Sequence, residues 1–140
     1  MTDYDYVVPR GMLITGPDAS NRLYAEQEKL RTYFPQFAFA RSADGNLFVR
    51  GTLRTNSGQS YPIRVVLSSD YPHGIPCIYP DGWDSACPHI YRAGNLCIMR
   101  PDQWRAFYSI AFAVAKTAIW LNKFEVFKAR GYWPGNEQQH

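Results

Sequence analysis

Lysine is scarce in this sequence of 140 residues, and basic residues form no cluster along it. Most of the positive charge comes from arginine, and the net charge is only +3, with a pI near 8.8. A nucleic-acid-binding surface is expected to show a concentrated basic patch, so we expect no nucleic-acid partner. The lysines are Lys29, Lys116, Lys123 and Lys128.

A long hydrophobic run is also missing. The longest apolar stretch covers residues 106–121 and contains Lys116, whereas a membrane-spanning helix needs about 20 residues with few charges. The first ten residues, MTDYDYVVPR, are acidic and polar and do not resemble a signal peptide. Three cysteines are an odd number, which argues against a disulfide framework. We therefore expect a cytoplasmic protein with free thiols and no membrane partner.

A glycine-rich loop that would hold phosphate groups is absent as well, so we expect no bound ATP and no cofactor. What the sequence does have is apolar material, with 46% hydrophobic and 16% aromatic residues. That is enough to build the core of one domain. We predict a single domain over residues 1–140, with a loose N-terminal arm at 1–16, a core at 17–131 and a tail at 132–140.

Residues 18–34 show the spacing of an amphipathic surface helix. Asp18 or Ser20 is predicted to cap its N-terminus, and Pro35 ends it. Glu26 is predicted to lie on a wetter face of this helix. The apolar positions that define the buried face are Leu23, Leu30 and Phe34.

Three strand-like runs follow the helix, and a shorter one comes later. The links at residues 42–45 (SADG) and 55–58 (TNSG) carry the turn residues of hairpins. These signals predict an antiparallel four-stranded meander. The predicted strands are residues 36–41, 46–54, 60–68 and 76–80.

A long loop rich in proline and glycine separates the last strand from the C-terminal part, and it contains His89 and Cys97. Long loops in compact domains are often functional. A helical period begins at about Ala106 and runs through Ala129, ending at Gly131. This order predicts an α+β fold in which a helical layer covers one sheet.

Two segments resemble ubiquitin-conjugating enzymes. YPIRVVLSSDYPHGIPCIYP (residues 61–80) is similar to that family's strand, Tyr-Pro turn and proline-flanked strand. PHIYRAGNLCIMRPDQW (residues 88–104) resembles its active-site segment, in which a His-Pro-Asn motif precedes a Gly-x-x-Cys turn and a tryptophan follows the cysteine. The resemblance covers residues 17–128. It implies the ubiquitin-conjugating (UBC-like) fold, with an N-terminal helix, a four-stranded meander, an active-site loop and C-terminal helices.

The sequence departs from this family at the His-Pro-Asn motif, which falls on Cys87-Pro88-His89. His89 stands where the family has the asparagine that steadies the oxyanion. The chain is also short and has no long acidic loop after the cysteine. In these features it is similar to prokaryotic members of the fold, in particular those encoded in bacterial antiphage operons of the CBASS type. The GYWPG segment (131–135) agrees with that similarity.

The resemblance implies that Cys97 is a nucleophile that carries an acyl group as a thioester, which a lysine amine then attacks. A neutral histidine has one N–H, so His89 is expected to donate to the oxyanion, and a protonated His89 would also favour the thiolate. Asp102 is expected either to orient the incoming amine or accept its proton, or to serve only as a cap or turn residue.

Four further residues are assigned to a groove beside the thioester or to partner binding. Tyr91 lines this groove or simply packs, and Asn95 belongs to the Gly-Asn turn before the cysteine. Trp83 is expected either to cover the groove as a lid or to be exposed for a partner. Trp104 comes with the family pattern, although most aromatic residues near the last helix are expected in the core.

The implied partners are proteins. The donor has a C-terminal tail and is either a CD-NTase-like nucleotidyltransferase or a ubiquitin-like protein. A ubiquitin-activating-like enzyme would spend the ATP, and a lysine-bearing protein would be the acceptor. The chain's own four lysines are also open to modification.

Three other interpretations are left open. The first is a zinc site, whose ligands would be Cys87, His89 and Cys97, with His73 as a distant fourth. The spacing of these residues is a poor match to the paired cysteines of structural zinc sites. A cysteine hydrolase would pair Cys97 with His89, although no oxyanion-hole motif supports it. A catalytically inactive UBC-fold module would bind a ubiquitin-like protein or a peptide, although such variants usually lack the cysteine. Cys77 is expected in the core, and Cys87 is expected to be structural or incidental, with a redox role as the alternative.

Overall fold

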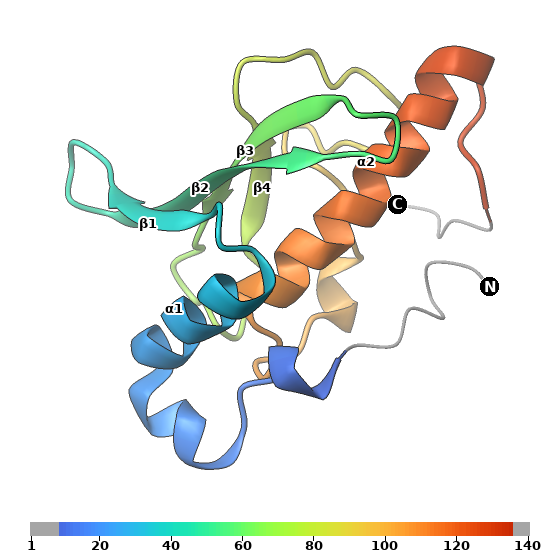
Figure 1. Cartoon of the computed structure of the whole chain (residues 1–140). Coiled ribbons are helices and arrows are strands. Elements are labelled where there is room, and N and C mark those ends of the chain that lie inside the picture. Colours follow the sequence, from blue (N-terminus) through green and yellow to red (C-terminus); the bar gives the residue numbers. More distant parts are fainter. Residues whose placement is uncertain (1–8, 136–140) are drawn as a thin grey trace.

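The computed structural model describes residues 9–135 (Figure 1). The predicted α+β order of a helix, a four-stranded meander, a long loop and a final helix is confirmed. Three short 3₁₀ helices cover Arg10–Met12, Gly16–Asn21 and Pro101–Gln103. The main elements are α1 (Arg22–Tyr33), β1 (Ala38–Arg41), β2 (Leu47–Arg54), β3 (Ser60–Val66), β4 (Cys77–Pro80) and α2 (Ile110–Arg130).

The sheet is antiparallel with the strand order β1-β2-β3-β4, and α2 runs diagonally beneath it (Figure 1). One cross-strand row joins Phe39 to Val49, Val49 to Val65, and Val65 to Ile78. The last three of these side chains have no exposed surface. Complete burial of such a side chain contributes about 1.5–3 kcal/mol, so this row is a main contact between the sheet and the rest of the core.

The final helix begins at Ile110, four residues later than the sequence pattern predicts. Ser109 is its N-cap, and its side chain accepts a hydrogen bond from the backbone N–H of Phe112 at 3.1 Å. Just before the helix, Phe107 and Tyr108 pair with the N-terminal segment, through Ile14 and Leu13, and are not helical. In residues 9–135 one helix, rather than several, follows the loop.

That N-terminal segment corrects a second prediction. Residues 10–14 belong to the arm that was expected to be loose, yet Met12 is 4% exposed and Ile14 is 2% exposed. The Ile14 N–H donates to the carbonyl of Phe107 at 2.8 Å. Burial of two apolar side chains and this pairing hold the segment against the core. Residues 1–8 and 136–140 lie outside the described part of the chain.

The start of α1 also differs from the prediction. Residues 16–21 form a 3₁₀ helix, and α1 itself begins at Arg22 after the N-cap residue Asn21. Neither Asp18 nor Ser20 caps it. The Ser20 hydroxyl donates to the Pro17 carbonyl at 2.8 Å, so this side chain stabilises the 3₁₀ turn rather than the helix end.

Candidate active site

The segment from His89 to Cys97 forms a small hairpin. Ile90 and Leu96 make an antiparallel bridge, and the Tyr91 N–H donates to the Asn95 carbonyl at 2.9 Å. The turn closes through Gly94, whose φ of 91° is accessible to glycine at little cost. The predicted Gly-x-x-Cys turn is therefore present, and glycine is needed there for its backbone conformation.

Two long-range contacts fasten this hairpin to the fold. The Leu96 N–H donates to the Ile78 carbonyl in β4 at 2.8 Å. The indole N–H of Trp120, in α2, donates to the His89 carbonyl at 3.1 Å, and the same carbonyl accepts the Cys97 N–H at 3.0 Å. The cysteine backbone is thus held between the sheet and the final helix.

Cys97 lies at the end of the hairpin and is 6% exposed. The Tyr91 hydroxyl donates to the Met99 carbonyl at 3.3 Å, so it spans the chain on the far side of the cysteine. Burial, and then a hydrogen bond with the Cys97 side chain, raise the pKa of Tyr91 well above its ordinary value of 10.0. The Tyr91 hydroxyl therefore lies within hydrogen-bonding reach of the Cys97 side chain.

His89 meets the cysteine through its backbone, while its ring packs against Trp133 with the ring centroids 4.5 Å apart. The backbone N–H of His89 also donates to the Cys87 side chain. Burial raises the pKa of the Cys87 thiol. The structure brings His89 and Cys97 together through their main chains, and the predicted role of the His89 side chain at the oxyanion stays a prediction. The contact with Trp133 was not predicted.

Asp102 lies in the 3₁₀ helix after the cysteine and is paired with Arg100 at 2.9 Å. This hydrogen bond lowers the pKa of Asp102. Its charge also contributes to the raised pKa of Tyr91, after burial and the Cys97 side chain. A carboxylate with a lowered pKa is a weak proton acceptor, so it is better suited to holding an ammonium group than to deprotonating it.

The remaining predicted groove residues are distributed differently. Asn95 stays in the hairpin turn. Trp104 is only 4% exposed and its indole N–H donates to the Pro72 carbonyl at 2.8 Å, so it packs in the core and does not reach a partner. Trp83 is only partly buried; its indole N–H donates to the Pro62 carbonyl at 2.6 Å and its ring packs on Tyr61, which ties it to β3 at the edge of the core.

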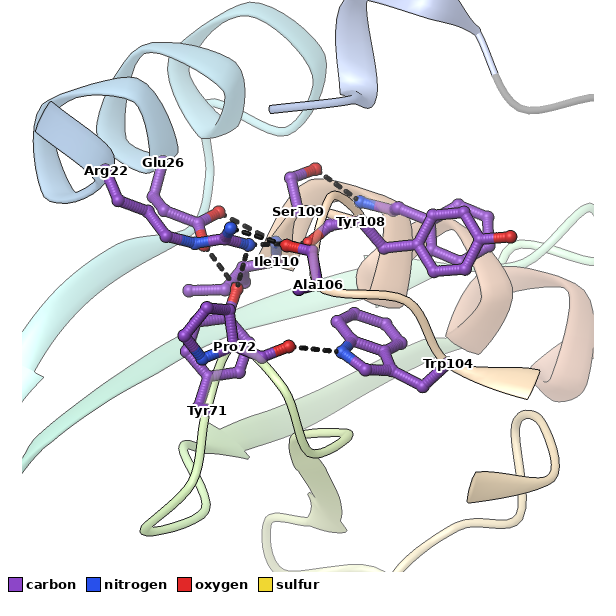
Figure 2. A network of polar contacts seen from close by, with 10 residues as sticks. Arg22, Glu26, Tyr71, Pro72, Trp104, Ala106, Tyr108, Ser109 and Ile110 are labelled. Atoms are coloured by element: carbon purple, nitrogen blue, oxygen red, sulfur yellow. Dashed lines mark hydrogen bonds and ion pairs between the residues drawn. The ribbon is translucent and has the colours of Figure 1, made fainter. Parts of the chain in front are cut away.

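Behind the loop that follows Cys97 lies a buried polar network (Figure 2). Glu26 was predicted on a wetter face, but it is 2% exposed. Its carboxylate is paired with Arg22 at 3.1 Å, accepts the Ile110 N–H at 2.8 Å and accepts the Tyr71 hydroxyl. These three partners replace the water that the carboxylate loses, and they explain why the prediction was wrong.

Arg22 extends the same network to the segment between the cysteine loop and α2 (Figure 2). Its guanidinium donates to the carbonyls of Ala106 at 2.6 Å and Tyr108 at 2.7 Å. Tyr71 and Trp104 pack together, with ring centroids 6.4 Å apart. The network therefore fixes the chain that leads away from the cysteine.

The zinc interpretation gains no support from the described residues. Within residues 9–135, no three histidine, cysteine or acidic side chains lie together in a way that would hold a metal ion. Cys77 is half-buried rather than fully buried, and burial raises the pKa of its thiol. No helix in this range is both long enough and apolar enough to cross a bilayer.

Three features of this region were missed in the sequence. Trp120 was predicted only as a core residue, although its indole N–H donates to the His89 carbonyl. Trp133 was predicted only as part of the tail, although its ring packs on the His89 imidazole. Glu26 was assigned to solvent. A signal was available only for Glu26, since Arg22 stands four residues before it and an i, i+4 pair of opposite charges is a known helix contact.

Solved structures of ubiquitin-conjugating proteins share this fold. A ubiquitin-conjugating enzyme E2 from Plasmodium falciparum matches with a TM-score of 0.53 at 16% identity, over 71% of this chain and 94% of that chain. An E2 from Plasmodium vivax gives 0.51 at 18% identity, over 69% and 97%. The UEV domain of yeast Vps23, in complex with a Vps27 PSDP peptide, gives 0.53 at 18% identity, over 95% and 98%. The fold is therefore that of the ubiquitin-conjugating proteins.

The sequence also matches a family model described as Type II CBASS E2 protein over residues 26–140, and the chain belongs to this family. The family resemblance drawn from the motifs around Tyr71 and Cys97 is confirmed. Membership places the chain among the E2-like conjugating proteins of CBASS. No curated protein sequence matches it.

Proposed function

We propose that this chain carries the C-terminus of a donor protein as a thioester on Cys97 and transfers it to a lysine amine. The observation that carries the proposal is the hairpin that holds Cys97 by its N–H, with the Tyr91 hydroxyl bonded at its side chain. Membership in the Type II CBASS E2 family supports it. The donor is the nucleotidyltransferase of the same operon, and a ubiquitin-like protein is the other candidate donor.

In the first step the Cys97 thiolate attacks the activated C-terminal carbonyl of the donor. A sulfur–carbon bond forms, and the activating partner's leaving group departs with the electron pair of the broken bond. That partner, a ubiquitin-activating-like enzyme, spends the ATP. Cys97 is 6% exposed in the free chain, so the hairpin must open enough for the donor carbonyl to reach the sulfur.

In the second step a neutral lysine amine attacks the thioester carbonyl. A carbon–nitrogen bond forms, the carbon–sulfur bond breaks, and the electron pair returns to the thiolate. Tyr91 and His89 are the groups of the hairpin that we assign as hydrogen-bond donors to the oxyanion that forms in between. Asp102, whose pKa is lowered by Arg100, attracts the lysine in its ammonium form. Water takes one proton before the attack, which gives the neutral amine, and a second proton from the nitrogen after the new bond has formed.

The role of His89 as a hydrogen-bond donor to the oxyanion is tested by substitution. His89→Asn restores the residue type that the ubiquitin-conjugating family has at this position, and His89→Ala removes the donor. We expect His89→Ala to slow discharge onto lysine, and His89→Asn to retain most of the rate. Equal rates in wild type and both variants, with thioester formation also unchanged, would remove His89 from the mechanism.

The function itself is tested by intact mass spectrometry of the chain co-expressed with its neighbouring genes. We expect a protein-sized adduct that thiol reagents remove from wild type, that is stable in Cys97→Lys and that is missing in Cys97→Ala. The matched control is Cys87→Ala, a half-buried cysteine ten residues away, which should keep the adduct. The mass of the adduct identifies the donor.

A second candidate function is a binding module without catalysis. The Vps23 UEV domain, which is seen with a bound peptide, covers 95% of this chain, and Cys97 is buried. If the neighbouring proteins are expressed and no adduct forms in any version, the chain is such a module. Cys97 would then be a buried thiol without a transfer role.

A further inference from the structure

The chain reverses direction after α2 and returns along that helix. Gly131 follows the last helical residue with a φ of 81°, and its N–H donates to the Phe127 carbonyl at 2.8 Å. This left-handed C-cap turns residues 132–135 back toward the body of the domain. The one tryptophan of this segment, Trp133, reaches the base of the Cys97 hairpin.

Trp133 makes ring contacts on two sides. Its ring centroid lies 4.5 Å from that of His89, with an interplanar angle of 37°. On the other side it lies 5.4 Å from Trp120 and 6.4 Å from Phe127. The imidazole of His89 is thus packed on an aromatic surface that belongs to the last helix and the tail, not to its own loop.

The two tryptophans hold different parts of His89. Trp120 donates its indole N–H to the His89 carbonyl, which also accepts the Cys97 N–H. Trp133 contacts the side chain. Since a histidine side chain rotates about two bonds, fixing the backbone alone leaves the imidazole direction undetermined. The contact with Trp133 acts on the imidazole itself.

The indole N–H of Trp133 has no hydrogen-bond acceptor among the residues that the structure describes, although it is buried. An unpaired buried donor is unfavourable for the folded state. The contribution of Trp133 at this position is therefore the contact of its ring with His89. Phenylalanine would keep a ring against His89 and remove the unpaired N–H, which makes it the matched control.

We propose that Trp133 is a positioning residue that sets the direction of the His89 imidazole at the Cys97 hairpin, so that the C-terminal segment forms part of the active site. The assignment rests on the proposed function, because it matters for catalysis only if His89 acts on the thioester. It extends that function to residues beyond α2. A chain ending at Arg130 would contain every hairpin residue and still hold His89 incorrectly.

The first test is structural and needs no donor. The imidazole proton resonances of His89 are measured by NMR in wild type, Trp133→Ala, Trp133→Phe and Tyr132→Ala, and they are assigned by their loss in His89→Asn. An indole ring whose centroid lies 4.5 Å from that of the imidazole shifts these resonances. We expect Trp133→Ala to move them toward the positions of a free histidine, whereas Trp133→Phe keeps a ring-current shift. Tyr132, which is 53% exposed, should have no effect.

The second test measures discharge of the wild-type and variant thioesters, obtained by co-expression, onto free lysine. A small displacement of a catalytic group can cost up to about 100-fold in rate. We expect a loss of about 10-fold or more in Trp133→Ala, recovery in Trp133→Phe, and no further loss when Trp133→Ala is added to His89→Asn. That absence of further loss separates positioning of His89 from general destabilisation.

Each result decides one question. Unchanged His89 resonances in Trp133→Ala overturn the proposed contact. Changed resonances with an unchanged discharge rate, or an equal loss in the His89→Asn background, overturn the positioning role while leaving thioester transfer intact. If wild type forms no adduct with its neighbours, the proposed function fails and this assignment fails with it, whatever the resonances show.

Discussion

The carboxylate of Glu26 accepts a hydrogen bond from the backbone N–H of Ile110 at 2.8 Å, which joins α1 to the first residue of α2. The two residues are 84 positions apart in the sequence. A helix N-terminus favours a negative charge because its first N–H groups are unpaired. Here another helix supplies the charge, so the start of α2 and the end of the cysteine loop are fixed together.

Removal of this carboxylate should strongly destabilise the domain. Glu26→Ala leaves Arg22 without its carboxylate partner and the Ile110 N–H without its acceptor, at a residue that is 2% exposed. Breaking a buried ion pair in this way costs about 3–5 kcal/mol. Urea unfolding followed by circular dichroism measures the change.

The matched control for that measurement is Glu28→Ala, on the same helix. Glu28 pairs with Arg31 on the surface, where the arginine side chain is 73% exposed. Surface changes of this kind stay within about 0.5 kcal/mol. Similar losses in the two variants would contradict the structural role given to the Glu26 network.

Tyr91→Phe should slow thioester discharge without unfolding the chain. The substitution removes only the hydroxyl that donates to the Met99 carbonyl at 3.3 Å and is bonded to the Cys97 side chain. Loss of one donor to an oxyanion typically costs about 100- to 1000-fold in rate, and we expect about 10- to 100-fold because His89 remains. Single-turnover discharge onto lysine gives the rate, and an unchanged rate would reduce Tyr91 to a packing residue.

The Cys97 thiol should react slowly with alkylating reagents in the folded chain. At 6% exposure it is less accessible than Cys77 and Cys87, which are half-buried. We expect iodoacetamide to modify Cys97 last, and all three residues to react at similar rates in urea. Peptide mass mapping over time gives the order. Fast modification of Cys97 in the folded chain would show that the hairpin is already open without a donor.

Glu125 should make the stability of the domain fall in acid. Burial opposes the shift, but hydrogen bonds from Tyr61, Thr55 and Ser57 together lower the pKa of Glu125 below its ordinary value of 4.5. A group with a depressed pKa stabilises the folded state above its unfolded pKa, and this contribution is lost as the pH falls through the folded value. The contribution is therefore complete at neutral pH and disappears in acid.

The comparison that checks this is urea unfolding of wild type and Glu125→Gln over the acid range. Wild type should be the more stable protein at neutral pH, and the difference should shrink as the pH falls below the ordinary value of 4.5. A difference that stays constant with pH would mean that the hydrogen bonds to Glu125 do not depend on its charge.

The sequence by itself determined the order of the elements and the turn before Cys97. Hairpin turns and alternating strands depend on residues within a few positions of each other. The turns at SADG, TNSG and Gly94 could therefore be predicted from the local sequence alone. The motifs around Tyr71 and Cys97 were equally local, and they were sufficient to identify the family.

Only the tertiary structure decided which side chains meet at the cysteine and which charges are buried. The helical periodicity around Glu26 predicts a side chain that faces solvent. Its burial depends on Tyr71 and Ile110, which come from distant parts of the chain. In the same way, the ring that packs on His89 comes from Trp133, beyond the end of α2. Burial of a polar group depends on partners that neutralise or hydrogen-bond it, and a periodicity within one segment carries no information about those partners.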